Sequence, residues 1–279
     1  MYGLCSFENG FEYLDISNAA AHAKITLQGA HIFEYLAQGR ESLLWLSDES
    51  SFKEGVAIRG GIPLCWPRFG NLDKTLPQHG FARVMLFELI SVEEPTPKLT
   101  EVHLQLKSSI QSREVWDYEF VLDVVFRISE KLTISMTTHN CDSREFLLTQ
   151  AFHSYFQVSD IANVTICGLE GISFLDTLRE KRYVENKPII IESEIDRVYE
   201  GAIGKIFLCD GKRRVEILAE NSASAIVWNP WIEKCSQMSG MKNEAYKEFV
   251  CIESANAFDD FKTLQAGQKD TITVHYQEV

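Results

Sequence analysis

Alternation of apolar side chains at every second position is the feature that most restricts how this chain of 279 residues can fold. It runs from Phe120 to Ile128 and again from Leu132 to Thr138, with Ser129-Glu130-Lys131 between the two segments. A period of two predicts half-buried antiparallel strands, and the polar tripeptide predicts a hairpin turn. We therefore expect a mainly β protein.

Many other short segments have strand character: residues 11–16, 23–27, 32–36, 84–92, 101–107, 146–156, 164–167, 172–175, 188–191, 205–209, 214–218, 225–228, 249–253 and 271–276. Gly, Asn, Asp and Pro turns separate them, which predicts a large antiparallel β-sandwich with few short helices. One short helix is expected within Ile232–Phe249, where Asn243-Glu244 could open a turn through Lys247. Glu93–Lys98 is predicted to be an exposed loop, and residues 1–279 are predicted to form a single domain.

Composition excludes several classes of partner. A net charge of −13 argues against nucleic acid and anionic membrane surfaces, because both require clustered Lys and Arg. No apolar run approaches the roughly 20 residues that span a bilayer. The seven cysteines are scattered and none forms a CxxC or a zinc-ligand pattern, so reduced thiols and a cytoplasmic location are expected. No exposed apolar stripe is evident, and a monomer is the default expectation.

The stretch Ile58–Val84, IRGGIPLCWPRFGNLDKTLPQHGFARV, is too rich in Gly and Pro for a helix or one continuous strand. Loops of this kind usually present side chains to a ligand from a rigid scaffold. This one carries Arg59, Gln78, His79 and Arg83. An arginine about 4 Å from a phosphate contributes on the order of 4 kcal/mol at an effective dielectric near 20, whereas distant surface acids are screened beyond about 8 Å. The stretch therefore predicts a pocket for an anionic, hydroxyl-rich small molecule.

Two residues are candidates for chemistry. Alternation places His153 near the end of the predicted strand 146–156, where a lone histidine is more often a hydrogen-bonded core residue. Glu253 continues the face of Phe249 and Cys251 in EFVCIESAN. A carboxylate on an apolar strand face is unusual because Glu is almost never buried unpaired. Desolvation would raise its pKa toward the range of a general base. The alternative is a strand-end acid in solvent.

Other polar residues have two interpretations each. Asp196 in SEIDRVY could contact a ligand or form a loop salt bridge. His79 could donate to a ligand or brace its own turn, and Arg68 could stack on its aromatic neighbours. The WNPW segment Trp228–Trp231 could form an aromatic wall for a sugar ring, although a packed loop anchor is the more frequent role and the one preferred.

Six motifs occur in order from about Gly55 to Asn256: RGGIPLCWPRFG, PQHGFAR, HSYFQV, SEIDRVY, WNPWIEK and CIESAN. This series resembles the hexose-6-phosphate mutarotases, the glucose-6-phosphate 1-epimerase branch of the aldose 1-epimerase superfamily. The resemblance implies a galactose mutarotase-like β-sandwich and catalysis without metal or organic cofactor. At the matching positions it implies that His153 and Glu253 are the catalytic pair, and that the substrate contacts are Arg59, Gln78, Arg83, Asp196 and His79.

The chemistry so implied is exchange of the α and β anomers of glucose 6-phosphate and related hexose 6-phosphates. Ring opening removes a proton from the C1 hydroxyl and delivers one to the ring oxygen, so Glu253 is expected to act as base and His153 as acid. Nearby negative charge is expected to raise the pKa of His153. Two alternatives stay open: an aldose 1-epimerase of unphosphorylated sugars whose arginines brace loops, and a sugar-phosphate-binding or regulatory protein without turnover.

Overall fold

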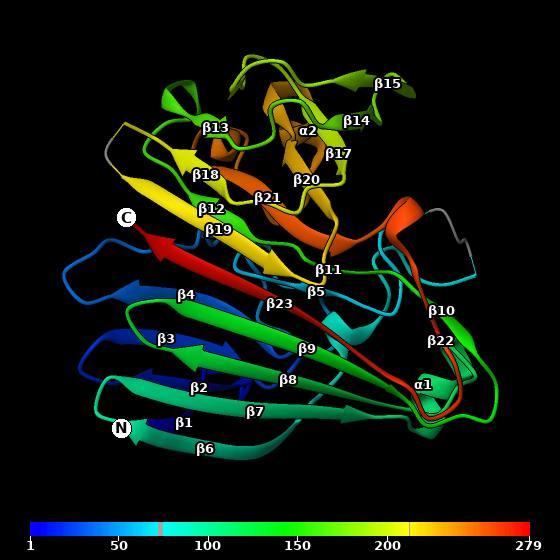
Figure 1. The fold of residues 1–279 in the computed structure, drawn as a ribbon. Helices are drawn as coiled ribbons and strands as arrows, with labels where there is room; N and C mark the ends of the chain where they lie inside the picture. The colour runs from blue at the N-terminus through cyan, green and yellow to red at the C-terminus, as the bar shows by residue number, and fades with distance from the viewer. Residues whose placement is uncertain (72–74, 212) are drawn as a thin grey trace.

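The computed structural model describes residues 1–71, 75–211 and 213–279, so residues 72–74 of the stretch Ile58–Val84 lie outside the described residues. Antiparallel strands dominate the fold (Figure 1). The hairpin predicted at Ser129-Glu130-Lys131 joins β8 (Phe120–Ile128) to β9 (Leu132–Asn140), in continuous register from Phe120↔Asn140 to Ile128↔Leu132. The prediction of a mainly β protein is therefore confirmed.

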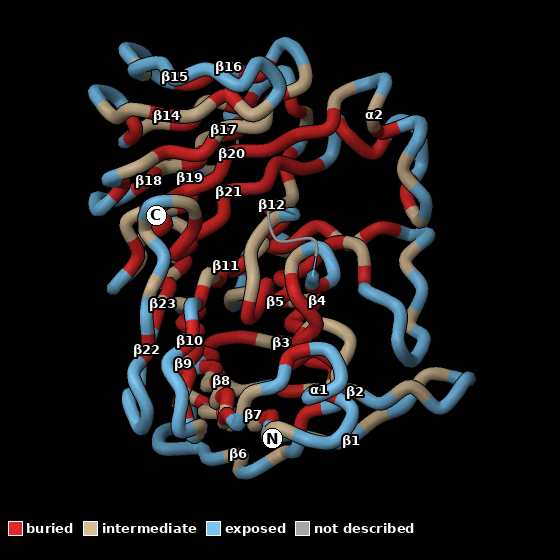
Figure 2. The backbone as a smooth tube through the Cα atoms, turned by 90° about the vertical axis from the view of Figure 1, so that its right-hand side faces the viewer, coloured by how far each residue is buried: buried red, intermediate tan, exposed pale blue. Residues whose placement is uncertain are grey.

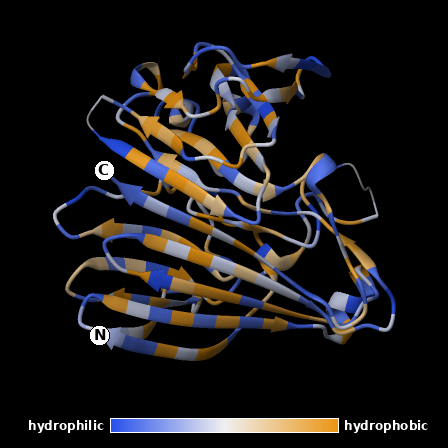
Figure 3. Cartoon of the chain, in the orientation of Figure 1, coloured by the Kyte–Doolittle hydropathy of each residue, from blue (hydrophilic) through white to orange (hydrophobic). Residues whose placement is uncertain are grey.

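Among the described residues, the largest sheet has nine strands, and its order is β16 (Ile189–Ile190), β13 (Thr165–Cys167), β18 (Ile206–Cys209), β19 (Arg214–Glu220), β23 (Lys269–Glu278), β9, β8, β7 (Leu99–Lys107) and β6 (Glu88–Thr96). Apolar and polar residues alternate along β7, β8 and β9 (Figure 3).

A second sheet of eight strands, counted over the same residues, has the order β15 (Lys181–Val184), β14 (Ser173–Asp176), β17 (Ile195–Glu200), β20 (Ser224–Asn229), β21 (Phe249–Asn256), β11 (Gln150–Phe152) and β5 (Leu64–Cys65), with β12 (Tyr155–Gln157) also paired to β21. The remaining strands are β1 (Tyr2–Ser6), β2 (Glu12–Ser17), β3 (Ala21–Thr26) and β4 (His31–Ala37) in one sheet, and β10 (Phe146–Leu148) with β22 (Lys262–Leu264) in another.

Helical segments in the described part of the chain are short: α1 (Ile110–Val115), α2 (Trp231–Gln237), and the 3-10 turns η1 (Ala82–Val84), η2 (Ile161–Asn163), η3 (Ala245–Lys247) and η4 (Phe258–Asp260). None of these described helices has the length and apolar character that a membrane crossing requires. The short helix expected from Asn243-Glu244 through Lys247 is the 3-10 turn η3, preceded by Glu244, whereas α2 lies earlier in the chain.

One face of the eight-stranded sheet packs on the nine-stranded sheet. The ring of Tyr276 on β23 lies 5.4 Å from the ring of Phe156, and its hydroxyl lies 2.5 Å from Ser154 Oγ. Because side chains alternate along a strand, Tyr155 faces the opposite side. Strands β20 and β21 are buried along their whole length (Figure 2). The sheet that will carry the site is thus fixed at the centre of the fold.

Buried apolar side chains from Leu14 to Tyr276 form one cluster, which supports the prediction of a single domain over residues 1–279. That assignment stays a prediction. Two local predictions are wrong. Strand β6 extends through Thr96 and so includes most of the predicted loop Glu93–Lys98. The predicted strand 146–156 is divided into β10, β11 and β12.

Candidate active site

His153 and Glu253 face each other across two neighbouring strands. Strands β11 and β12 both pair with β21, with Phe152 opposite Ser254 and Tyr155 opposite Cys251. The same register continues between these pairs and places His153 opposite Glu253. Facing residues of an antiparallel pair have their Cβ atoms about 4.5–5.5 Å apart and project from the same face. The sheet itself therefore brings the two candidate groups together.

The ladder is interrupted at this point. The backbone N–H of His153 donates to the carbonyl of Pro63 at 3.0 Å, and that of Tyr155 donates to Gly61 at 2.9 Å, so the segment 58–84 supplies partners that β21 does not. The ring of His153 stacks on that of Tyr155, with centroids 4.8 Å apart and planes 12° from parallel. Backbone bonds and ring packing together fix the orientation of the imidazole.

The side chains of the pair approach closely. His153 Nε2 lies 3.5 Å from Glu253 Oε1, and the two side chains are 12% and 2% exposed. Within the described residues, His153 Nδ1 and Glu253 Oε2 are buried without a hydrogen-bond partner. Leaving a buried polar atom unpaired costs about 1–3 kcal/mol, and in a native protein such atoms need an explanation. Contact with a substrate would provide one.

A cavity of about 620 Å³ lies over this pair, and its floor is one face of the eight-stranded sheet. The floor consists of residues that neighbour one another across β17, β20, β21 and the strands beside it: Asp196, Val198, Ile226, Trp228, Glu253, His153 and Tyr155. Asp196 lies directly opposite Trp228, and Ile226 directly opposite Glu253. Asp196 thus lies on a strand and not in a loop, as one of its two interpretations had it.

The segment 58–84 supplies a wall of the same cavity, contributing Arg59, Gln78, His79 and Arg83. All seven predicted site residues therefore line one space. Gly60 and Gly61 fix the course of this wall, because a Cβ on either would lie 2.5 Å from backbone atoms of the neighbouring segments. Arg68 is not among the lining residues; its guanidinium donates to the carbonyls of Leu147 and Pro67.

Arg83 and His79 have contacts within the wall. Arg83 Nη2 donates to the carbonyl of Gln78 at 2.6 Å. His79 Nδ1 accepts from the backbone N–H of Gly70 at 3.3 Å, and its own N–H donates to Gly70 at 2.9 Å. Burial, together with the charges of Arg83 and Arg59, lowers the pKa of His79 to about 3. His79 is thus a neutral side chain that braces its turn, as one of its two interpretations anticipated, and it also lines the cavity.

Burial dominates the protonation of the central pair. It holds the pKa of His153 well below its ordinary value, with further lowering from His79 and Arg83, and it holds the pKa of Glu253 well above its ordinary value. The expectation that nearby negative charge raises the pKa of His153 stays a prediction, whereas the raised pKa of Glu253 is as expected. Both shifts favour one proton for the pair, on the carboxyl group, with a neutral imidazole.

The raised pKa of Glu253 predicts that the Glu253→Gln variant is more stable than the wild-type protein at pH values above the ordinary pKa of a glutamate carboxyl group. A raised pKa in the folded state means that stability is fully present below the unfolded pKa and is lost as the pH rises through the folded pKa. Gln cannot ionise, so the variant avoids this loss. The thermal midpoint of the variant should therefore exceed that of the wild-type protein by an amount that grows with pH, about 2–4 °C for each kcal/mol of stability that the wild-type protein loses. Thermal melts at a series of pH values measure it.

The exposed Glu41 provides the control for that series, because Glu41→Gln should melt in parallel with the wild-type protein at every pH. Parallel curves for Glu253→Gln as well would show that Glu253 is not held neutral by burial.

Two further side chains line the cavity, Trp228 and Lys234, and neither of them was placed there from the sequence. Trp228 lies on β20 and its ring is 6.0 Å from that of His153, so the interpretation as a loop anchor is wrong for Trp228. Trp231 begins α2, where its ring lies 5.2 Å from that of Tyr246. Lys234 of α2 also lines the cavity, with its Nζ 3.0 Å from Glu194. A lysine on an exposed helix gives no sequence signal of this position.

Asp196 is the remaining carboxyl side chain on the floor. Burial raises its pKa, and the hydroxyl of Thr177 donates to its backbone carbonyl at 3.1 Å. Arg197 beside it points elsewhere and pairs with Glu185 at 2.8 Å, so the two do not form the loop salt bridge considered above. No group of three or more His, Cys, Asp or Glu side chains in the described part of the chain is arranged to hold a metal ion.

Comparison with known proteins gives concordant matches. The profile of the family described as aldose 1-epimerase matches residues 12–277. A protein of Cenchrus ciliaris, provisionally named as a glucose-6-phosphate 1-epimerase, is 35% identical over 259 residues, which cover 88% of this chain and 78% of that protein. An Escherichia coli protein with the same provisional name is 34% identical over 252 residues, covering 88% and 84%. A solved structure from Salmonella typhimurium, provisionally described as a mutarotase, has a TM-score of 0.93 at 30% identity, covering 100% of this chain and 93% of that one.

Proposed function

Because the chain belongs to the aldose 1-epimerase family and is an isomerase, we propose that it interconverts the α and β anomers of a hexose 6-phosphate, with His153 and Glu253 as its acid and base. The observation that carries the proposal is the pair itself. Two groups of complementary protonation lie 3.5 Å apart on rigid neighbouring strands, and each has a buried atom without a partner among the described residues. That is the arrangement a hemiacetal requires.

The reaction moves two protons. The C1 hydroxyl of a cyclic hemiacetal loses one and the ring oxygen gains one, after which rotation about C1–C2 and the reverse transfers close the ring on the other face. One proton shared by Glu253 and His153 suffices, because its transfer from the carboxyl group to the imidazole yields an ionised base and a charged acid. A sugar phosphate carries roughly −1.5 to −2 charges near pH 7, and this negative charge in the cavity would stabilise the imidazolium.

Arg59 and Arg83 are proposed to bind the 6-phosphate through charge-assisted hydrogen bonds, for which the planar guanidinium is well suited. Both line the cavity from the segment 58–84, on a different wall from the catalytic pair. Gln78 and Asp196 are proposed to contact sugar hydroxyls, with His79 beside them. The names of the curated relatives support a phosphorylated substrate for this chain. That the protein acts as a cytoplasmic monomer stays a prediction.

One observation favours the second candidate, an epimerase of unphosphorylated sugars. Arg83 already donates to the carbonyl of Gln78 at 2.6 Å, which is the loop-bracing contact that this candidate assigns to it. Its remaining guanidinium donors still allow phosphate contact, since the side chain has five N–H groups. The two candidates differ in substrate and therefore in one simple experiment.

We expect purified protein at micromolar concentration to accelerate the relaxation of α-glucose 6-phosphate to the anomeric equilibrium, followed by polarimetry or exchange NMR against a buffer blank. Free glucose and galactose should be much poorer substrates, because they lack the group that the arginines bind. Acceleration for the free sugars alone would select the second candidate. No acceleration for any of them would leave a binding protein without turnover.

A further inference from the structure

The connection between β3 and β4, residues 27–30, contacts both of the segments that carry the cavity arginines. The backbone N–H of Gly29 donates to the carbonyl of Met85 at 2.8 Å, and the backbone N–H of Phe87 donates to the carbonyl of Leu27 at 3.0 Å. Two backbone hydrogen bonds therefore join this connection to the residues that follow Arg83. At Gly29, a Cβ would lie 2.7 Å from the carbonyl oxygen of Arg83. The backbone of Arg83 therefore rests directly on the connection.

The side chain of Gln28 extends the contact to the segment before Arg59. Its Oε1 accepts from the backbone N–H of Gly55 at 2.8 Å, and its Nε2 donates to the carbonyl of Val56 at 2.9 Å. Gln28 is only 4% exposed, although Gly55 and Val56 are exposed. A buried amide whose oxygen and nitrogen both bind one exposed turn acts as a bidentate clamp on that turn.

The residue that follows Arg59, Gly60, is also held from this part of the chain. His31, the first residue of β4, donates from Nε2 to the carbonyl of Gly60 at 2.9 Å and is 1% exposed. The two ends of the segment 58–84, which carry Arg59 and Arg83, are thus both held from residues 27–31. This support lies outside the proposed active site, since none of these residues lines the cavity over His153.

We propose that Gln28 is a positioning residue that fixes the placement of Arg59 relative to Arg83 and thereby sets the affinity for the 6-phosphate group. The inference rests on the proposed function, because it assigns a phosphate to the two arginines. Gln28 itself touches no substrate. Its two hydrogen bonds hold the turn three residues before Arg59, while the backbone of the same connection holds Arg83.

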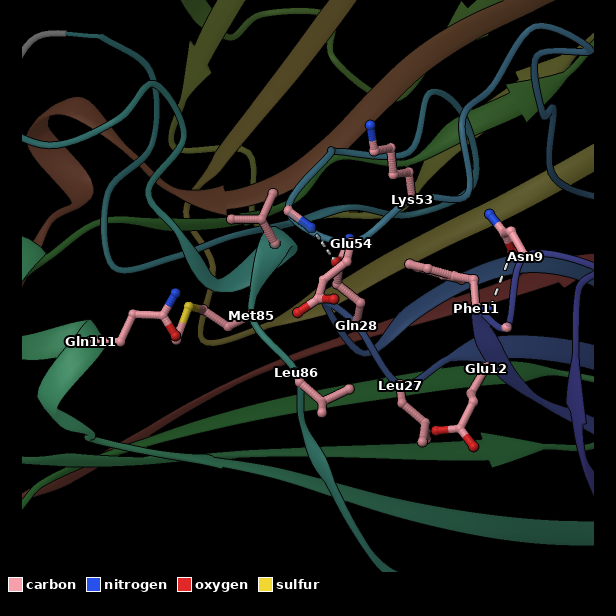
Figure 4. Close-up of a pocket in the computed structure, with 13 residues that line it drawn as sticks. Asn9, Phe11, Glu12, Leu27, Gln28, Lys53, Glu54, Met85, Leu86 and Gln111 are labelled. Carbon is pink, nitrogen blue, oxygen red and sulfur yellow. Dashed lines mark hydrogen bonds between the residues drawn. The ribbon is translucent and has the colours of Figure 1, made fainter.

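Gln28 lines a second cavity, of about 630 Å³, on the outer side of this support. Figure 4 shows its side chain between Leu27 and Glu54, with Met85 and Leu86 on the neighbouring segment and Gln111 approaching from α1. Gln111 lines the same cavity, but it lies on a helix that does not carry a site residue. The exposed Gln111 therefore serves as a control for the loss of a glutamine at this cavity.

The test compares Gln28→Met with Gln111→Met. Met keeps the length of the Gln side chain but loses both hydrogen bonds, and water can satisfy the exposed Gly55 and Val56 groups, so the thermal midpoint should change little. KM for α-glucose 6-phosphate should rise about fivefold, as expected for loss of a net hydrogen bond of ordinary strength. The kcat for this sugar, and kcat/KM for free glucose, should stay within twofold, and Gln111→Met should match the wild-type protein in every respect.

Each other outcome decides against the inference. A Gln28→Met protein with unchanged KM, or one in which phosphorylated and free sugars are affected alike, shows that Gln28 does not act through the arginines. A lowered thermal midpoint with a loss of kcat for both sugars shows a general structural role instead. A wild-type protein without preference for the phosphorylated sugar overturns the proposed function, and the positioning role with it.

Discussion

Glu253→Gln and His153→Asn are each expected to lower kcat for anomer exchange by about 10²–10⁴-fold, the usual contribution of one positioned proton-transfer group. Gln cannot take the proton of the C1 hydroxyl, and Asn cannot deliver one to the ring oxygen. Both variants keep a polar side chain of similar size, so KM should change much less than kcat. Exchange NMR at saturating hexose 6-phosphate measures the effect on kcat directly.

The double variant adds a sharper test of the pair. Groups that act as a unit have non-additive effects, so the two substitutions together should cost about as much as one alone. His22→Asn provides a control, because His22 contacts Asp15 and Glu34 on the outside of the four-stranded sheet and does not line the cavity. Full activity in either single variant would mean that the roles of acid and base belong to other residues.

Arg59→Ala and Arg83→Ala are each expected to raise KM for hexose 6-phosphates by about 10- to 100-fold, since a hydrogen bond to a charged group contributes roughly 1.5–3 kcal/mol. The kcat should be largely retained, because the proposed mechanism places the reacting carbon over the pair on the sheet and not at the loop. For free glucose the same variants should behave like the wild-type protein. Initial rates over a range of both sugars provide the comparison.

Arg127→Ala is a suitable control for the loss of a positive charge, since Arg127 lies on β8 and pairs with Glu101 at 2.7 Å, away from the cavity. If Arg59→Ala and Arg83→Ala leave the ratio between phosphorylated and free sugar unchanged, neither arginine binds the phosphate. The contact from Arg83 to Gln78 would then be its whole role.

Local pattern was sufficient to predict most strands, because alternation reports which face of a strand is buried. It failed where long-range partners decide the structure. The sequence FLLTQAFHSYFQV alternates without Gly or Pro, yet the strand divides at His153 because the carbonyls of Pro63 and Gly61 bind its backbone there. Likewise, Pro95 suggested a loop, but β6 is the edge strand of its sheet, where a missing N–H breaks no ladder bond.

The candidate site was predictable residue by residue because its chemistry is concentrated in motifs. Arginines in a Gly- and Pro-rich stretch, and a glutamate on an apolar strand face, are visible without a structure. Trp228 and Lys234 were not assigned to the cavity, since an aromatic residue on a strand and a lysine on a helix are common everywhere. The roles of all seven predicted residues stay predictions until the variants are measured.

The division of labour between the sheet and the segment 58–84 has an evolutionary consequence. The distance between His153 and Glu253 follows from the spacing of adjacent strands, which no surface change can alter, while Arg59 and Arg83 sit on a wall built from irregular backbone. Under the proposed roles, changes near Arg59 and Arg83 would alter the choice of sugar, whereas Gly61 and Pro63, which bind the backbone of Tyr155 and His153, must be kept for proton transfer to stay intact. A protein of this design can therefore diversify its substrates at the arginine-bearing ends of that segment, and laboratory redesign of its specificity should begin there and leave β5 and the other strands unchanged.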